Sequence, residues 1–302
     1  MNRLIVVLVL VWCSAGCGPL SSPGTRNPGS ESRYQRSEIR ERTPGKKKEA
    51  DDGKAFYFVQ LTDTHWGARD GVTQTRQAVA MINALPVAIE FVVVTGDVFS
   101  DSIRRDDVRE DGLAAMKGLK VPVYYVPGNH DLPQTDRART AGLFEKYFGP
   151  LSQKVEIGGV TCLFLNTEMM EGEKRSPGEV ERDWVEAELG SGSAGKTALL
   201  FMHRPPVRDL MNGSDGAVSW DELYDTRWKD VFIRHPEIKA VFAGHFHRDV
   251  MCWIGAVPVY VSPAVARFWD RQPAFRLYQL KGGQVNYWTL YPERPRSTPA
   301  LR

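Results

Sequence analysis

The sequence predicts an α/β fold in which two β-sheets pack face to face and helices cover them. Up to about residue 239, short apolar runs alternate with stretches of helical period, a pattern typical of a parallel sheet with covering helices. After that point the helical stretches stop and short strands follow one another. Among these, 250–254 and 257–261 are separated only by Gly255 and Ala256, which indicates a hairpin. A parallel first half and an antiparallel second half therefore favour two sheets over one.

The individual elements follow from hydrophobic periodicity. Apolar runs rich in β-branched and aromatic residues predict strands at 56–61, 91–95, 121–126, 160–166, 197–202, 240–243, 250–254, 257–261, 274–280 and 285–290. Apolar residues at helical spacing predict helices at 73–85, 105–119, 137–148, 177–189 and 220–234. No internal repeat or second linker interrupts them, so we expect residues 55–292 to form one domain and 293–302 to be a flexible tail.

The first seventeen residues have the pattern of an export signal. A basic start is followed by the apolar run 4–12, which as a helix would extend only about 14 Å and cannot cross a hydrocarbon core of roughly 30 Å. Such a run is typical of a secretory signal peptide. The sequence Ser14-Ala15-Gly16-Cys17 resembles the lipobox of bacterial lipoproteins, which predicts an exported protein anchored to a membrane of the cell envelope or periplasm through lipidated Cys17. Simple cleavage, giving a freely secreted protein, is the alternative.

Residues 18–54 are predicted to be a disordered tether. They hold five Gly, four Pro and five Ser among nine basic and six acidic residues, so they cannot bury enough apolar surface to offset the entropy of ordering. The whole chain carries a formal charge of +2, but residues 1–54 contain ten basic and six acidic residues. Residues 55–302 then hold 29 basic and 31 acidic residues. This balance shows no nucleic-acid footprint.

The cysteines of the expected domain, Cys162 and Cys252, lie in apolar strand-like runs. They are either one disulfide or two buried thiols, and the absence of a CxxC pair argues against a cysteine-based metal site.

Five expected strands end in a short polar turn that contains His, Asp or Asn. Because ligands bind beyond the carboxyl ends of parallel strands, we expect these turns to converge. A one-residue gap lets both side chains of a turn point the same way, and glycines at 96 and 128 permit tight turns and close backbone approach. The side chains in these turns that could bind metal are Asp63, His65, Asp97, Asn129, His203, His245 and His247.

The chemistry of this set suits two divalent ions. Imidazole and carboxylate ligands accept Mn, Fe or Zn. With Asp97 shared, the seven residues supply eight coordination contacts, enough for two open sites. The charge of two divalent ions exceeds that of two carboxylates and a hydroxide, so such a centre stays positive, which suits an incoming phosphate. Asn129 is a neutral ligand and adds no negative charge.

In this order the motifs D-x-H, G-D, G-N-H-D, H and G-H-x-H of residues 63–247 resemble those of the calcineurin-like metallophosphoesterase superfamily. The resemblance implies a four-layer α/β/β/α sandwich of two mixed sheets. It also implies a phosphatase or phosphodiesterase that hydrolyses phosphomonoesters or phosphodiesters through a metal-bridging hydroxide. One metal would be held by Asp63, His65, Asp97 and His247, and the second by Asp97, Asn129, His203 and His245.

Further roles follow from the same resemblance. His130 would contact the phosphate and protonate the leaving group, and Asp131 would orient His130 and raise its pKa. Arg204 would reach a phosphate oxygen or pair with a surface carboxylate. Asp101 is interpreted as a helix cap. Residues 203–206, H-x-P-P, are similar to the cyclic-nucleotide phosphodiesterase branch. Purple acid phosphatases are a second neighbour, but Ser100 stands where they place a tyrosine ligand.

Two other functions fit the sequence less well. A non-catalytic surface lipoprotein could keep the fold as a binding module, and an extracytoplasmic nuclease could use the same metals. The complete ligand set with His130 argues against the first, and the charge balance argues against the second. Loops 168–177 and 208–219 are expected to select the substrate, whose identity, like the oligomeric state, the sequence leaves open.

Overall fold

The computed structural model describes residues 55–168, 170, 178–190, 196–207, 226–267 and 271–292. The expected signal peptide, tether and tail lie outside the described residues, as do most of the loops 168–177 and 208–219.

The first sheet has five strands in the order β11-β10-β1-β2-β3. Strands β1, β2 and β3 are parallel, while β10 and β11 run antiparallel to their neighbours. Phe56 at the start of β1 pairs with Leu280 near the end of β10. The strand bounds are β1 Phe56–Leu61, β2 Phe91–Thr95, β3 Val123–Val126, β10 Phe275–Lys281 and β11 Gln284–Leu290.

The second sheet has six strands in the order β4-β5-β6-β7-β9-β8. Its four central strands, β5, β6, β7 and β9, are parallel, and the edge strands β4 and β8 are antiparallel to their neighbours. The strand bounds are β4 Gln153–Ile157, β5 Val160–Leu165, β6 Thr197–Met202, β7 Ile238–Ala243, β8 Val250–Ile254 and β9 Val257–Val261.

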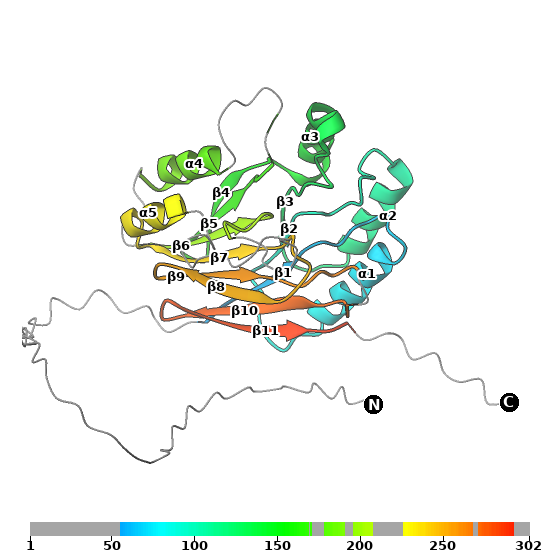
Figure 1. Ribbon diagram of the computed structural model, residues 1–302. Coiled ribbons are helices and arrows are strands. Elements are labelled where there is room, and N and C mark those ends of the chain that lie inside the picture. Colours follow the sequence, from blue (N-terminus) through cyan, green and yellow to red (C-terminus); the bar gives the residue numbers. More distant parts are fainter. Residues whose placement is uncertain are drawn as a thin grey trace, which may run out of the picture. The chain divides into compact units, whose positions relative to one another are not determined.

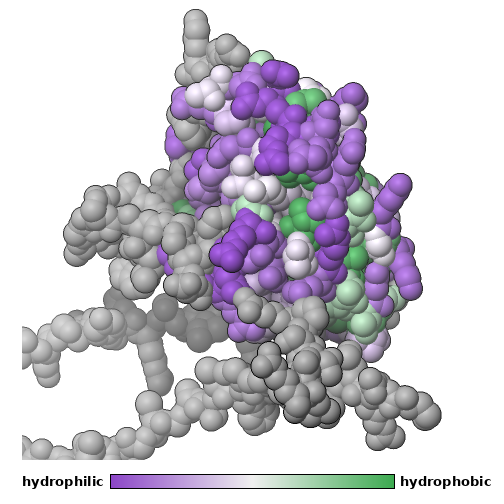
Figure 2. Space-filling view, turned by 90° about the vertical axis from the view of Figure 1, so that its right-hand side faces the viewer, coloured by the Kyte–Doolittle hydropathy of each residue, from purple (hydrophilic) through white to green (hydrophobic). Residues whose placement is uncertain are grey.

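Helices cover the outer faces of the two sheets and complete an α/β/β/α arrangement (Figure 1). Helices α1, α2 and α3 pack on the first sheet, and α4 and α5 on the second. The side of the domain with α1 and α2 is largely hydrophilic, with small apolar patches (Figure 2). Within the described residues, no helix is both long and apolar enough to cross a membrane. The helix bounds are α1 Gly71–Ile82, α2 Asp106–Met116, α3 Arg137–Phe148, α4 Glu179–Gly190 and α5 Thr226–Arg234, with a short 3₁₀ turn η1 at Gln134–Asp136.

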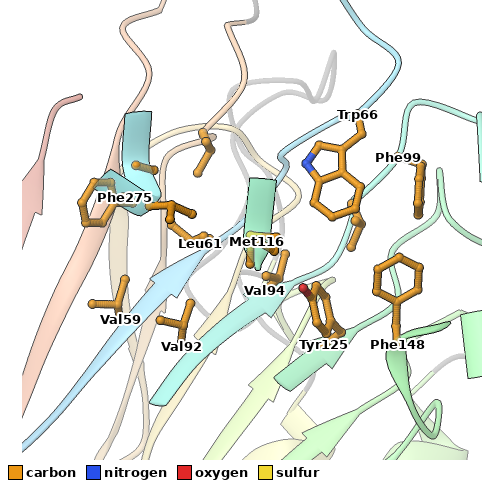
Figure 3. Packing of buried hydrophobic residues seen from close by; sticks show 14 of the residues in the cluster. Val59, Leu61, Trp66, Val92, Val94, Phe99, Met116, Tyr125, Phe148 and Phe275 are labelled. Atoms are coloured by element: carbon orange, nitrogen blue, oxygen red, sulfur yellow. The ribbon is translucent and has the colours of Figure 1, made fainter. Parts of the chain in front are cut away.

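Side-chain alternation along the strands divides the core into layers. In β1, Val59 and Leu61 face α1 and α2, whereas Phe58 enters an aromatic layer between the sheets. Figure 3 shows Val59 and Leu61 beside Val92 and Val94 of β2, next to Trp66, Phe99, Tyr125 and Phe148. Every residue of β2 is buried, because helices cover one of its faces and the second sheet covers the other. This packing fixes the strand ends from which the site is built.

The predicted fold class is confirmed, with two differences in detail. Parallel and antiparallel strands are not divided between the halves of the chain, because β10 and β11 extend the sheet that β1 begins. The half-buried edge strand β4 was not predicted, since its polar residues hide the alternation. Of the helix expected at 220–234, residues 226–234 are described and helical. Cys162 and Cys252 are both free thiols: Cys162 lies between the sheets, and Cys252 packs against the core beneath α4 and α5.

Candidate metal centre and active site

The turns that follow β1, β2, β3, β6 and β7 meet at one end of the sandwich. Backbone hydrogen bonds connect them: the Asp63 N–H donates to the Gly96 carbonyl, and the Gly244 N–H donates to the His203 carbonyl. The predicted ligands on these turns form two groups whose ligand atoms lie within 4.8 Å of one another. One group is Asp63, His65, Asp97 and His247, and the other is Asp97, His203 and His245.

All four residues of the first group are buried. The Nε2 atoms of His65 and His247 lie 3.3 Å apart, and His247 Nε2 lies 3.1 Å from Asp63 Oδ1. His65 Nε2 is 3.9 Å from both Asp63 Oδ1 and Asp97 Oδ2. Two imidazole nitrogens and two carboxylate oxygens therefore point at one small volume.

The second group shares Asp97 with the first. His203 Nε2 lies 3.3 Å from Asp97 Oδ2 and 3.2 Å from Asn129 Oδ1. The His245 ring lies 5.0 Å from the His203 ring. The four predicted ligands of the second metal are thus brought together around the shared carboxylate. A one-residue gap was expected to point both side chains of a turn the same way. Asp63 and His65 do belong to one ligand group, but His245 and His247 belong to different groups.

The ligand turns have an unusual backbone. Asp63, His65, Asp97, His245 and His247 all have positive φ angles between 43° and 72°. Non-glycine residues rarely adopt this left-handed conformation, which costs of order 1–3 kcal/mol each and persists where the surroundings enforce it. In both D-x-H and H-x-H the first and third residues adopt it, which turns the chain sharply at the end of β1 and of β7.

Two glycines make room for these turns. A Cβ on Gly128 would lie 2.3 Å from Asp97 Oδ1, and a Cβ on Gly96 would lie 2.3 Å from the His203 ring. Any larger residue would displace a predicted ligand. The close backbone approach expected at these positions is confirmed.

Each carboxylate holds one oxygen on the protein and presents the other to the imidazoles. Asp63 Oδ2 accepts hydrogen bonds from the Thr62 hydroxyl and the His245 N–H, and Asp97 Oδ1 accepts one from the His130 N–H. The opposite oxygens, Asp63 Oδ1 and Asp97 Oδ2, face the histidines. His203 is oriented in the same way, because its Nδ1 lies 2.9 Å from the Thr95 carbonyl and donates to it, which leaves Nε2 for the site.

Burial keeps two of the histidines neutral. It lowers the pKa of His65 to about 4, although the nearby Asp63 and Asp97 oppose the change. Burial, with the charges of His203 and Arg204, lowers the pKa of His245 to about 3. Neutral imidazole is the form that binds metal.

His203 and Asp97 behave as an ion pair without a metal. Burial alone would lower the pKa of His203, but attraction and a hydrogen bond to Asp97 outweigh it and raise that pKa to about 10. The same contacts lower the pKa of Asp97 against the effect of burial. The pKa of Asp63 is also lowered, because attraction and a hydrogen bond to His247 outweigh burial.

This arrangement fits two divalent cations. The convergent atoms are lone-pair donors of the imidazole and carboxylate classes that Mn, Fe and Zn accept, and the residues of the first group are all buried. The Nε2 atoms of His65 and His247 face each other at 3.3 Å, and His247 Nε2 lies 3.1 Å from Asp63 Oδ1, so these donor atoms converge on one point. A buried Asp/His cluster compatible with a dinuclear metal site is therefore present.

His130 lies at the edge of this cluster with its side chain 40% exposed. Its ring is 5.2 Å from the His65 ring, and its Nδ1 lies 3.0 Å from Asp101 Oδ2. Asp101 was expected to cap a helix, but α2 begins at Asp106 and Asp101 instead contacts the His130 ring. The one sequence feature that could have pointed to Asp101 as the partner of His130 is its position, four residues after the ligand Asp97.

Asp131 is not the partner of the His130 ring, contrary to the expectation. Its fully buried carboxylate accepts hydrogen bonds from the N–H groups of Val98, Phe99 and Gly128. Burial and the charge of Asp97 raise the pKa of Asp131 to about 7, against the effect of these three donors. Asp131 therefore joins the turn after β2 to the turn after β3 and fixes the relative positions of Asp97 and Asn129.

Arg204 forms an ion pair with Glu168, an acid that no sequence motif marks as its partner. Its Nε and Nη2 donate to the two oxygens of Glu168 at 2.8 and 3.3 Å, and its Nη1 lies 2.9 Å from His245 Nε2. Glu168 is buried, so it is not a surface carboxylate, which was one of the two partners considered for Arg204. The pair still directs one guanidinium nitrogen at the second ligand group.

Comparison with known proteins identifies the family. The model of the calcineurin-like phosphoesterase domain matches residues 56–249. The chain belongs to this family. Its enzyme class, a phosphoester hydrolase, is the predicted one, and the alternative of a non-catalytic module is not favoured.

Relatives with two different activities resemble the chain. It is 26% identical over 253 residues to the human serine/threonine-protein phosphatase CPPED1, covering 75% of this chain and 80% of the relative. It is 28% identical over 227 residues to a probable cyclic nucleotide phosphodiesterase of Rhodopseudomonas palustris, covering 69% and 78%.

Solved structures share the fold. A dimetal phosphatase from Danio rerio matches with a TM-score of 0.54 at 17% identity, over 79% of this chain and 99% of the other. A purple acid phosphatase from yellow lupin matches with a TM-score of 0.56 at 12% identity, over 78% and 51%. The four-layer architecture expected from the motifs is confirmed.

Proposed function

We propose that this chain hydrolyses phosphomonoesters or phosphodiesters with two divalent metal ions, Mn, Fe or Zn, in the two ligand groups that share Asp97. The observation that carries the proposal is the position of His130 at the edge of this cluster with Asp101 behind its ring. Asp63, His65, Asp97 and His247 would hold one ion, and Asp97, Asn129, His203 and His245 the other. When bound, the ions would supply positive charge for the phosphoryl oxygens and lower the pKa of the attacking water.

The side chains of this chain divide the remaining work. His130 would donate a proton from Nε2 to the leaving oxygen, because Asp101 contacts the other ring nitrogen, Nδ1. Asp101 is then a positioning residue, because it acts through His130. Arg204 would contact a non-bridging phosphate oxygen, held in direction by Glu168. Asp131 would contribute by fixing the ligand turns rather than by touching substrate.

The location proposed from the sequence narrows the substrate. We propose that the chain is exported and anchored through lipidated Cys17, so its substrates would be extracytoplasmic phosphomonoesters, nucleotides or lipid-derived phosphodiesters. The named relatives include a phosphatase and a probable phosphodiesterase, which supports testing both ester classes.

A substrate and metal panel tests the activity. Metal-free full-length protein is reloaded with Mn²⁺, Fe²⁺ or Zn²⁺ and assayed on p-nitrophenyl phosphate, bis-p-nitrophenyl phosphate, a cyclic nucleotide and a nucleoside monophosphate. We expect hydrolysis of at least one ester with at least one metal, and its loss in Asp97→Asn. The control is His235→Ala, because His235 pairs with Glu237 at the opposite end of β7. No hydrolysis in any combination, with fewer than one ion bound per chain, would refute the proposal.

A further inference from the structure

A second feature lies at the end of the sandwich opposite the metal ligands. A groove of about 670 Å³ runs past the first residue of β7, Ile238, whereas the ligand turn follows the last, Ala243. The groove passes from the end of α5 across the β8–β9 turn to the β10–β11 turn. We call five of its side chains the distal patch: the exposed Ile233, Met251, Trp253 and Lys229, and the half-buried Lys239.

The apolar part of the distal patch is exposed because the two sheets differ in width. Strand β9 is covered by the first sheet, since the Tyr260 ring lies 5.4 Å from the Tyr287 ring of β11. Strand β8 forms the edge beyond it. Met251 pairs with Tyr260 and therefore lies on the same face, the one that turns toward the other sheet.

These side chains are unusually open for their type. Met251 is 41% exposed, Trp253 55% and Ile233 68%. Single exposed apolar residues are ordinary, but a group of them around one groove marks a binding surface. Trp is also the side chain favoured at the boundary between membrane and water.

The charge of the distal patch has one sign. Lys229 and Lys239 line the groove, and none of the described residues that line it is acidic. The Lys229 stem lies against the β8–β9 turn, since a Cβ on Gly255 would be 3.7 Å from its Cγ. Cations beside exposed apolar side chains complement an anionic lipid surface.

The point at which the chain enters the domain is at the same end. Phe56, the first residue of β1, pairs with Leu280, two residues before the β10–β11 turn that borders the groove. The sequence just upstream contains Lys46, Lys47 and Lys48.

We propose that the distal patch docks on an anionic lipid bilayer, with its three apolar side chains entering the headgroup region and its lysines contacting lipid phosphates. The metal ligands then face away from the bilayer, which favours soluble substrates over lipids embedded in it. This inference does not depend on the proposed hydrolysis, and its test does not measure activity.

The test is vesicle binding by the full-length chain carrying Cys17→Ser, so that no lipid anchor contributes. Partition is measured by flotation with phosphatidylcholine vesicles, with and without phosphatidylglycerol. We expect Ile233→Ser with Trp253→Ser to weaken binding at least tenfold. Lys229→Gln and Lys239→Gln should each weaken binding to anionic vesicles about fivefold. Tyr291→Ser is the matched control, because Tyr291 is 48% exposed and follows the end of β11 at the metal-ligand end.

A local measurement separates the distal patch from the apolar run of residues 4–12. Hydrogen exchange of residues 251–257 should slow when anionic vesicles are added, and that of residues 288–292 should not. Unchanged exchange of residues 251–257, or equal partition of the serine variant and its parent, overturns the proposal. Slow exchange of residues 251–257 in the absence of vesicles also overturns the proposal. If this protection rises with protein concentration, a second copy of the chain covers the distal patch; if it does not, another segment of the same chain covers it.

Discussion

Asp101 Oδ2 lies 3.0 Å from Nδ1 of His130, although the two residues are 29 positions apart in the chain. Asp101 has a φ of 52°, and five of the predicted metal ligands also have positive φ angles. The Asp101 side chain is 58% exposed. A strained, exposed acid that contacts one ring nitrogen leaves the other nitrogen of His130 directed elsewhere. This contact assigns to Asp101 the positioning role that the sequence suggested for Asp131.

The first prediction concerns proton donation. His130→Ala should slow hydrolysis of esters with poor leaving groups by about 10²–10⁴-fold, the usual contribution of a general acid. p-Nitrophenyl esters should be slowed much less, because their leaving group needs little protonation. The measurement is kcat for alkyl and p-nitrophenyl phosphates, and equal slowing of both would argue against His130 as the acid.

Asp101→Asn should give a weaker form of the same selective loss. The amide can still contact Nδ1 of His130 but no longer offers a negative charge, so we expect about a tenfold fall on poor leaving groups. Asp131→Asn should behave differently, because its three backbone donors hold the ligand turns together. Asp131→Asn should lower thermal stability and metal content, and should therefore slow hydrolysis of all substrates alike. The reverse pattern would return the positioning role to Asp131.

The second prediction concerns metal content. Asp97 belongs to both ligand groups, whereas His245 belongs only to the second. After dialysis against a weak chelator, Asp97→Ala should retain close to no metal and His245→Ala about one ion per chain. Elemental analysis by mass spectrometry gives these numbers, with His235→Ala as the histidine control that keeps two. A variant of His245 that still binds two ions would remove it from the ligand set.

The third prediction concerns protons. The Asp97 carboxylate raises the pKa of His203 to about 10, so this imidazole is protonated in the metal-free protein at pH 7.5. His65 and His245, with pKa values lowered by burial to about 4 and about 3, are already neutral. Because a ligand must be deprotonated, binding at the second group should release about one proton.

The sign of the pH dependence follows from this release. Below pH 10 the proton on His203 competes with the metal, so affinity should rise with pH, by up to about tenfold per unit. Calorimetric titration with Mn²⁺ in two buffers of different ionisation enthalpy counts the released protons. Identical heats in both buffers would mean that His203 loses no proton.

The fourth prediction concerns Arg204 and Glu168. If Arg204 binds the phosphate, Arg204→Lys keeps the charge but loses the fork that Glu168 orients, and KM should rise by roughly 10-fold, the value of one charge-assisted hydrogen bond. Glu168→Gln should raise KM less, with kcat nearly unchanged in both variants. Arg234→Lys, which alters an exposed pair with Glu186, is the control. A fall in kcat at constant KM would contradict a binding role.

The strand-end motifs could be predicted because their geometry is local. An apolar run that stops at Asp63 or Asp97 indicates both the strand and the edge at which it ends. The partners of His130 and Arg204 could not be found in this way, because each contact joins turns about 30 residues apart or more. Their pairing depends on which strands are neighbours in a sheet, β2 with β3 for His130 and β5 with β6 for Arg204, which no short motif encodes. Asp131 was misassigned for the same reason: its neighbour in sequence is His130, but the N–H groups that it binds come mainly from the turn after β2.

The fifth prediction compares two helical glycines and tests how the core supports the site. A Cβ on Gly112 of α2 would lie 2.0 Å from the ring of Trp66, which is fully buried beside the ligand His65 and donates from Nε1 to the Thr75 hydroxyl. Gly112→Ala should therefore lower the free energy of unfolding by about 1–3 kcal/mol or more through overpacking. Gly142→Ala in α3 meets no atom within 4 Å and should raise it by about 1 kcal/mol, because alanine favours a helix. Urea unfolding of both variants measures the difference. Because Trp66 directly follows the ligand His65, Gly112→Ala should also weaken metal binding, whereas Gly142→Ala should leave it unchanged. Equal stability of the two variants would show that the Trp66 ring can move freely.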